Sequence, residues 1–256
     1  MAIQRNEIPI LEFDDDKNAV IQPEHEGLDM RLPEKAVFAF LGDWVDRYAR
    51  EHQAVLAGEF QCITKTFPVY VTEYRGEAVC LCQAPLGSAA AAQLMDWLIG
   101  YGVRKIIAAG SCGALMPLPE NAFLLPVRAL RDEGTSYHYL KPARYVELEQ
   151  EVIRSMERTL EKLGLPYETC TTWSTDGFFR ETREKVAYRR AEGCAVVEME
   201  CAALAACARM RGVKFGQILY TADSLANMDD YDARNWGSDS MEKALLLCLE
   251  LVRELE

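Results

Sequence analysis

Residues 105–115 read KIIAAGSCGAL, a short apolar run that ends in two glycines enclosing two small polar residues. A run of this length bounded by turn residues is typical of a buried β-strand. In open α/β sheets, ligands bind beyond the carboxyl ends of the strands. We therefore expect a loop at 110–113, where backbone amides and the Ser111 hydroxyl contact a small anionic or hydroxylated ligand, or where the glycines serve close packing.

Short apolar or β-rich runs alternate with helical patterns on both sides of this stretch. The runs predict strands at 36–41, 77–84, 105–110, 122–127, 169–173, 194–199 and 214–221. The helical patterns cover 43–57, 88–101, 146–163, 182–191, 200–211 and 238–255. This alternation predicts an α/β fold with a parallel or mixed sheet covered on both faces. Because no repeat or long linker divides the chain, we expect one domain over residues 1–256, with residues 1–34 as an N-terminal extension.

The composition indicates a protein that acts on a small molecule. The 256 residues carry a formal charge of −12, which disfavours a nucleic-acid backbone or an anionic membrane as a partner. The nine cysteines lack the spacing of a zinc site or a disulfide framework, so neither is expected. No signal-peptide pattern and no apolar run long enough to span a bilayer is present, so we expect a cytoplasmic location.

The segment 196–207, VVEMECAALAAC, carries the strongest functional signal. A buried strand runs into Glu198, Met199 and Glu200, after which an Ala-rich helix begins. Two carboxylates one residue apart on an extended backbone point the same way, and carboxylates accept hydrogen bonds from the vicinal hydroxyls of a sugar. A helix N-terminus alone needs only one acid. The pair therefore favours a ribose-type site.

Other turns after predicted strands offer weaker signals, and in each a cap or turn residue is the structural alternative. Gly42 ends a strand in LGDW, and Gly87 precedes a helix whose amino end could meet an anion. Phe178 in STDGFF could stack on a planar ring. Asp223 in TADSLAN could donate a proton to a leaving group if burial raises its pKa.

With these segments in order, the chain resembles the nucleoside phosphorylase superfamily, which includes uridine phosphorylase, bacterial purine nucleoside phosphorylase and methylthioadenosine nucleosidase. The resemblance covers roughly residues 25–255, and the combination of GSCGA with EMECAALAA is its most specific part. It implies a three-layer α/β/α sandwich around a mixed, partly barrel-like β-sheet, and assembly into a homodimer or homohexamer. It also implies cleavage of the N-glycosidic bond of a purine-type ribonucleoside or uridine, with no metal or organic cofactor.

The resemblance assigns roles to individual residues. Glu200 would bind the ribose 2′- and 3′-hydroxyls while the bond breaks, with Met199 against the sugar and Glu198 supporting near the base. Phe178 would pack on the base or the sugar. Asp223 would protonate a purine as it leaves, so Glu200 and Asp223 are the implied catalytic residues.

The resemblance also assigns residues that bind the group attacking the ribose, which is phosphate or water. It further assigns residues that act at the site of a neighbouring subunit. His25 would reach the 5′-hydroxyl of a nucleoside bound by that subunit. Phosphorolytic relatives hold phosphate with arginines, and the matching positions here are Asp46, Ala108 and Lys65, the last on the neighbouring subunit. A lysine cannot reproduce the bidentate contact of an arginine. The phosphate or water site would be formed by Gly42, Lys65, Gly87 and Ser111.

Three functions are therefore open at the sequence level. One is a phosphorylase with inorganic phosphate as co-substrate, helped by Arg47, Arg128 or Arg131. The second is a nucleoside hydrolase in which Asp46 or Asp43 activates water. The third is a nucleoside-binding protein without turnover. The Glu-Met-Glu segment favours an enzyme, and Asp223 favours a purine-type base.

Overall fold

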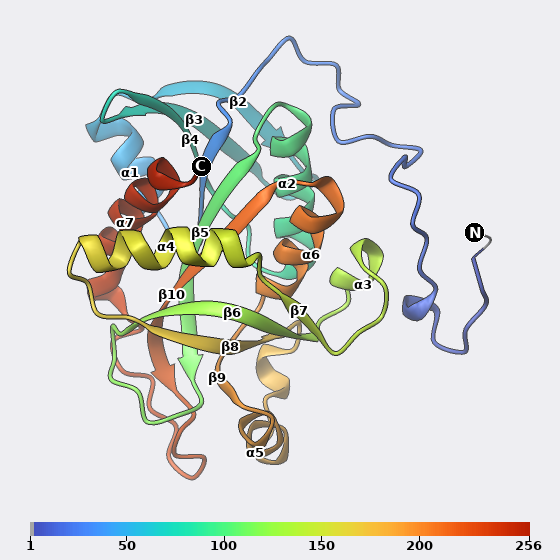
Figure 1. The fold of residues 1–256 in the computed structure, drawn as a ribbon, viewed down its shortest axis with the longest axis vertical. Helices are drawn as coiled ribbons and strands as arrows, with labels where there is room; N and C mark the ends of the chain where they lie inside the picture. The colour runs from blue at the N-terminus through green and yellow to red at the C-terminus, as the bar shows by residue number, and fades with distance from the viewer. Residues whose placement is uncertain (1–2) are drawn as a thin grey trace.

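The computed structural model describes residues 3–256, so residues 1–2 of the expected extension lie outside the described part. Figure 1 shows a central sheet with helices on both sides. The strand order is β10-β6-β8-β9-β5-β1-β4-β3-β2, with β7 paired to β6. The strands are β1 (Lys35–Ala39), β2 (Val55–Gln61), β3 (Thr66–Tyr74), β4 (Glu77–Gln83), β5 (Lys105–Ala114), β6 (Phe123–Asp132), β7 (Tyr145–Glu147), β8 (Glu168–Thr175), β9 (Cys194–Glu198) and β10 (Lys214–Ser224). The helices are α1 (Trp44–Glu51), α2 (Ser88–Gly100), α3 (Ser136–Tyr139), α4 (Gln150–Lys162), α5 (Arg183–Ala191), α6 (Cys201–Arg211) and α7 (Met241–Glu254), with 3-10 turns η1 (Pro9–Leu11), η2 (Phe178–Arg180) and η3 (Ser238–Ser240).

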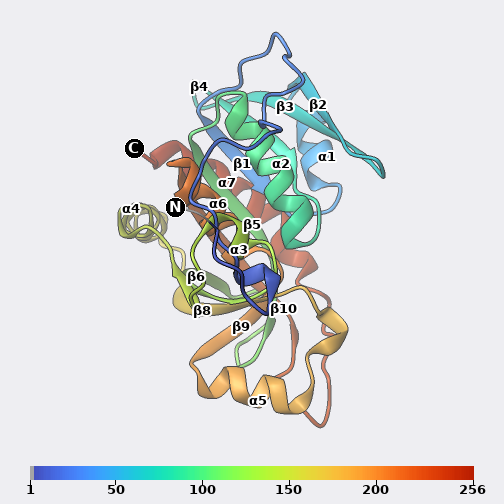
Figure 2. The same ribbon diagram turned by 90° about the vertical axis from the view of Figure 1, so that its right-hand side faces the viewer.

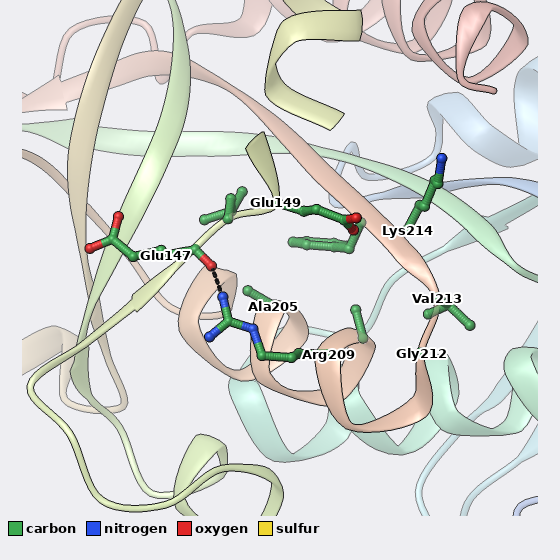
Figure 3. Close-up of a pocket in the computed structure, with 10 residues that line it drawn as sticks. Glu147, Glu149, Ala205, Arg209, Gly212, Val213 and Lys214 are labelled. Carbon is green, nitrogen blue, oxygen red and sulfur yellow. Dashed lines mark hydrogen bonds between the residues drawn. The ribbon is translucent and has the colours of Figure 1, made fainter. Parts of the chain in front are cut away.

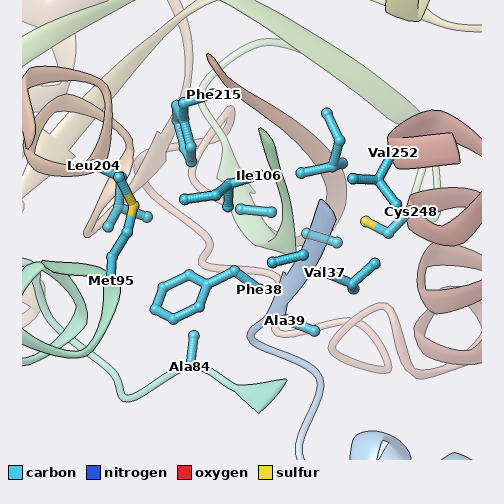
Figure 4. Packing of buried hydrophobic residues seen from close by; sticks show 14 of the residues in the cluster. Val37, Phe38, Ala39, Ala84, Met95, Ile106, Leu204, Phe215, Cys248 and Val252 are labelled. Carbon is cyan, nitrogen blue, oxygen red and sulfur yellow. The ribbon is translucent and has the colours of Figure 1, made fainter. Parts of the chain in front are cut away.

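Apolar side chains on both faces of the central strands explain the layers. Successive side chains of a strand point to opposite faces. In β1, Val37 faces Val252 of α7, whereas Phe38 faces the side covered by Met95 of α2 and Leu204 of α6 (Figure 4). The sheet is thus buried between two helical layers, and the predicted three-layer α/β/α sandwich is confirmed.

Five of the strands close into a ring. β10 pairs in parallel with β5 and antiparallel with β6. The ring continues through β8 and β9, and β9 returns to β5 through the pair Gly113–Val197. Ala114 of β5 is also paired with Ser224 of β10, so the last residues of β5, β9 and β10 meet. This closed ring confirms the mixed, partly barrel-like sheet, and α5 lies beyond its end (Figure 2).

Some predicted elements differ from the structure. The helix predicted over 43–57 ends at Glu51, and residues 55–61 form β2 at the sheet edge with β3 beside it. The helix predicted over 146–163 begins only at Gln150, because residues 145–147 form β7. The prediction of a loop at 110–113 is also wrong. These residues form the last part of β5, because they pair with residues of β10 and β9.

Residues 3–34 run along the outside of the molecule before β1 (Figures 1 and 2). The 3-10 turn η1 contacts α3, and Nε1 of Trp97 in α2 donates a hydrogen bond to Glu26 at 3.0 Å. Leu32 is buried, whereas most of the segment before it is exposed. No helix within residues 3–256 is both long and apolar enough to cross a membrane.

Candidate active site

A cavity of about 340 Å³ opens where β5, β9 and β10 end. It is lined by Phe40, Leu86, Gly110, Ser111, Cys112, Gly113, Phe178, Phe179, Glu181, Val197, Glu198, Met199, Glu200, Gln217, Asp223 and Trp236. The structure therefore brings together most of the residues that the sequence singled out, namely Ser111, Phe178, Glu198, Met199, Glu200 and Asp223. Four other predicted site residues, His25, Gly42, Lys65 and Gly87, do not line this cavity.

Glu198 anchors the start of α6. Its Oε2 accepts hydrogen bonds from the backbone N–H groups of Glu200 and Cys201, each at 2.7 Å. Its Oε1 accepts from the hydroxyls of Ser174 at 2.5 Å and Thr172 at 3.2 Å. Burial raises the pKa of Glu198, and these donors oppose that effect because they stabilise the ionised form. Glu198 thus fixes the backbone on which Glu200 stands.

Glu200 joins the start of α6 to the turn before α2. Its Oε1 accepts a hydrogen bond from the backbone N–H of Gly87 at 2.6 Å, and Ser88 Oγ donates to the Met199 carbonyl at 2.6 Å. Burial, followed by the charge of Glu198, raises the pKa of Glu200 to about 8. The sequence predicts that the turn at Gly87 binds an anion. In the structure the Gly87 N–H instead donates its hydrogen bond to the Glu200 carboxylate.

Asp223 and Glu181 form an acidic pair at another wall of the cavity. Asp223 is buried, and a Cβ at Gly113 would lie only 3.3 Å from its Oδ1, so the glycine leaves room for this carboxylate. Burial raises the pKa of Asp223. Burial, followed by the charge of Asp223, raises the pKa of Glu181 to about 7, against the opposing effect of Lys185. This wall can hold a proton near neutral pH.

Aromatic side chains border the same cavity. Phe178 and Phe179 of η2 pack edge to face with ring centroids 5.0 Å apart, and Phe178 is 44% exposed. Trp236, on the segment between β10 and η3, is 49% exposed. The half-exposed rings of Phe178 and Trp236 offer flat apolar surfaces to a planar ligand.

Gly42 and Lys65 lie in an adjoining cavity of about 370 Å³ that shares Phe40 and Leu86 with the first. The Lys65 ammonium lies 5.1 Å from the centre of the Phe67 ring. Lys65 therefore lies next to the 340 Å³ cavity, and Phe40 and Leu86, which line both cavities, stand between Lys65 and the other predicted site residues.

The arginines that could have replaced the missing phosphate ligands are engaged elsewhere. Arg47 pairs with Glu51 on α1, and Arg128 donates to the Thr171 hydroxyl. Arg131 is buried and donates to Ser136 Oγ and to two backbone carbonyls. Asp46, a predicted base for water, accepts a hydrogen bond from the Tyr70 hydroxyl at 3.0 Å. Within residues 3–256, no Lys or Arg lines the 340 Å³ cavity.

His25 lies in the N-terminal segment, where its Nδ1 is 3.0 Å from the Gln22 carbonyl. It borders a separate crevice between that segment, α2 and α3. Its role at a neighbouring subunit stays a prediction.

Another cavity, of about 370 Å³, lies between α6 and the β7–α4 connection (Figure 3). There, Arg209 donates a hydrogen bond to the Glu147 carbonyl. Lys214 begins β10 whereas Asp223 lies near its end, so this cavity is at the opposite end of the strand. It contains none of the predicted site residues.

The sequence reasoning missed several lining residues, among them Phe179, Glu181, Gln217 and Trp236. Glu181 follows the aromatic pair in STDGFFRE, so an acid at that spacing was the available signal. Gln217 is a polar residue in the middle of the apolar run FGQIL, and its strand neighbours could not be known from sequence.

The model of the phosphorylase superfamily matches residues 36–253, and the chain belongs to this superfamily of nucleoside phosphorylases and nucleosidases. A guanosine phosphorylase of Halorubrum lacusprofundi is 25% identical over 205 residues, which cover 75% of this chain and 82% of that protein. The fold is similar to that of uridine phosphorylase from Vibrio fischeri, with a TM-score of 0.75, 20% identity and 95% of each chain covered. It is also similar to that of AMP nucleosidase from Bacteroides thetaiotaomicron, with a TM-score of 0.70, 23% identity, and 87% of this chain and 88% of that one covered.

Proposed function

We propose that the protein cleaves the N-glycosidic bond of a purine-type ribonucleoside. The observation that carries this proposal is that Glu200 and Asp223 line one cavity together with the aromatic ring of Phe178. A cavity of about 340 Å³ is of the size that holds a small organic ligand. The reaction uses no metal and no organic cofactor in this proposal.

At the sugar end, Glu200 acts on the ribose. In its ionised form, which becomes populated as the pH approaches its pKa of about 8, the Glu200 carboxylate accepts hydrogen bonds from the 2′- and 3′-hydroxyls. The same form stabilises the positive charge that develops on the ribose as the bond to the base breaks. Glu200 is suited to this task because its Oε1 is already oriented by the Gly87 amide. Met199, held through its carbonyl by Ser88, packs beside the sugar.

At the base end, Asp223 supplies a proton to the departing base. Burial favours its neutral form, which is the form that can donate a proton. A purine offers a ring nitrogen that accepts this proton, and the similarity to a guanosine phosphorylase supports the same base class.

The acceptor of the ribose is either phosphate or water. Phosphorolysis is supported by the similarity to a guanosine phosphorylase. In that case Ser111, Gly42 and Lys65, which line the two adjoining cavities, would bind the phosphate. Hydrolysis is the second candidate, and the lining of the cavity favours it: carboxylates of Glu181, Glu198, Glu200 and Asp223 surround a space without a Lys or Arg among residues 3–256. A phosphate dianion gains little in such surroundings.

The test is to incubate the protein with guanosine, inosine, adenosine and uridine, with and without phosphate, and to separate the products. We expect release of a purine base faster than release of uracil. Free ribose identifies hydrolysis, and ribose 1-phosphate identifies phosphorolysis. Tight nucleoside binding without release of any base would support the binding protein and contradict the proposal.

A further inference from the structure

Gln217 is a buried polar side chain that lines the cavity. It is 1% exposed, and within residues 3–256 its Oε1 has no hydrogen-bond partner. A buried amide without a partner is unfavourable in an apolar core, where a residue such as Met would fill the same space. A ligand in the cavity that Gln217 lines could supply the missing hydrogen bond.

The strand register places Gln217 beside Ala108, the position to which the resemblance assigns a phosphate-binding arginine in phosphorolytic relatives. β10 and β5 run in parallel, and Gln217 is paired with Ala108. Both side chains lie on one face of the sheet, because paired residues of neighbouring strands point the same way. Phe215, two residues before Gln217, lies near Leu204 of α6 on that face (Figure 4).

Gln217 and Glu200, the residue that precedes α6, both line the 340 Å³ cavity. Ala108 is fully buried in the core and brings no charge, and on the neighbouring strand Gln217 supplies a neutral amide beside it instead of a guanidinium. An amide has one acceptor and two donor hydrogens, which suits a water molecule, whereas a phosphate dianion requires positive charge.

We propose that the side-chain amide of Gln217 binds the water molecule that attacks C1′ of the ribose, so that this protein is a nucleoside hydrolase. The inference rests on the proposed function and names its second substrate. In the step, the water oxygen forms a bond to C1′ while the bond between C1′ and the base nitrogen breaks. The electron pair of that bond stays on the base, which takes a proton from Asp223. The proton lost by the water passes to the ionised form of Glu200, which releases it to solvent, and Asp223 regains a proton from solvent.

The decisive experiment compares the wild type with Gln217→Met, a variant of similar volume that removes only the amide. In phosphate-free buffer, the wild type should release ribose and purine base in equal amounts, at a rate that added phosphate does not increase. For Gln217→Met we expect kcat to fall about 100-fold with KM for the nucleoside nearly unchanged, since the water is misplaced while the nucleoside contacts remain. Its unfolding temperature should equal or exceed that of the wild type. Gln93→Met on the exposed side of α2 is the matched control and should behave as the wild type.

The outcomes separate this inference from the proposed function. Ribose 1-phosphate as the product, formed only when phosphate is present, would overturn the inference and leave the proposed function standing. A Gln217→Met variant with wild-type kcat would do the same. Absence of base release by the wild type from every nucleoside tested would contradict the proposed function itself, and the inference with it.

Discussion

Glu200 connects the two helices whose amino ends border the cavity, and its carboxylate is the group on which the proposed chemistry depends most. Replacing it with alanine removes the acceptor for the ribose hydroxyls. For Glu200→Ala we expect kcat/KM to fall about 100- to 1000-fold, the size of effect that follows loss of one preorganised electrostatic contact. The measurement is the initial rate of base release, and circular dichroism checks the fold. Glu184→Ala, at an exposed position of α5, is the control, and unchanged turnover in Glu200→Ala would rule out its assigned role.

The raised pKa of Glu200 also makes stability depend on pH. The unfolded chain releases this proton near the usual value of 4.5, whereas the folded protein keeps it up to about 8. Between these values the folded state binds more protons, so the free energy of unfolding should decrease as the pH rises from 4.5 to 8. Urea unfolding at pH 5 and at pH 8 measures the difference, which should be smaller in Glu200→Gln. Equal pH dependence in the two proteins would contradict the buried, protonated state.

For single residues, the sequence predicts cavity-lining residues that belong to a recognisable motif. It misses those whose place in the cavity is set by the pairing of neighbouring strands. The sequence singles out Glu200 and Asp223 because each follows a predicted strand in a conspicuous segment. Gln217 became significant only through its register with Ala108. The supporting role of Glu198 near the base stays a prediction, and its hydrogen bonds to the first turn of α6 are a further contact that the sequence does not predict.

Among the elements, the turn before α2 matters because Gly87 has φ 92° and ψ 140°, a conformation that only glycine adopts readily. An added Cβ would meet nothing within 4 Å, so Gly87→Ala introduces backbone strain without a clash. We expect a loss of about 1–3 kcal/mol in the free energy of unfolding, together with lower kcat because the amide that orients Glu200 moves. Gly164→Ala, at φ 65° and equally free of contacts, is the comparison and should cost less.

A larger loss in Gly164→Ala than in Gly87→Ala would refute the strain argument. Denaturant unfolding of both variants gives the two free energies.

Whether the sequence predicts a strand depends on how far that strand is buried. Strands buried on both faces, such as β1 and β5, are short apolar runs and were predicted. β2 and β3 were missed because an edge hairpin needs no such run: Val55 and Leu56 are 67% and 53% exposed, and Gly58 interrupts the strand where Met30 packs against it. The predicted helix over 43–57 overlaps the start of this hairpin, whereas α1 ends at Glu51.

For the whole molecule, the N-terminal segment is the part that contributes least to the core. We propose that residues 1–34 are an extension of a single domain, as the sequence predicts. Residues 3–21 include no buried side chain, so deleting residues 1–21 should change the unfolding temperature by less than about 2 °C, whereas a deletion through Leu32 should lower it clearly. Differential scanning calorimetry tests both truncations. A large loss of stability on removing residues 1–21 would show that the segment belongs to the core.

The homodimer or homohexamer implied by the resemblance also stays a prediction at this scale. Sedimentation of the full chain and of the same truncation tests it. The exposed apolar side chains of Val20 and Ile21 would be covered in an assembly that uses the segment.

Trp236 gives the cavity an optical signal of its own. Trp97 and Trp173 are almost fully buried, whereas the indole of Trp236 is 49% exposed and lines the same cavity as Phe178, the ring assigned to the base or the sugar. A purine stacked there would quench or shift its fluorescence, so occupancy could be titrated with the unmodified protein and without any turnover. Ligand affinity and catalytic rate then become separately measurable, even for nucleosides that bind but do not react.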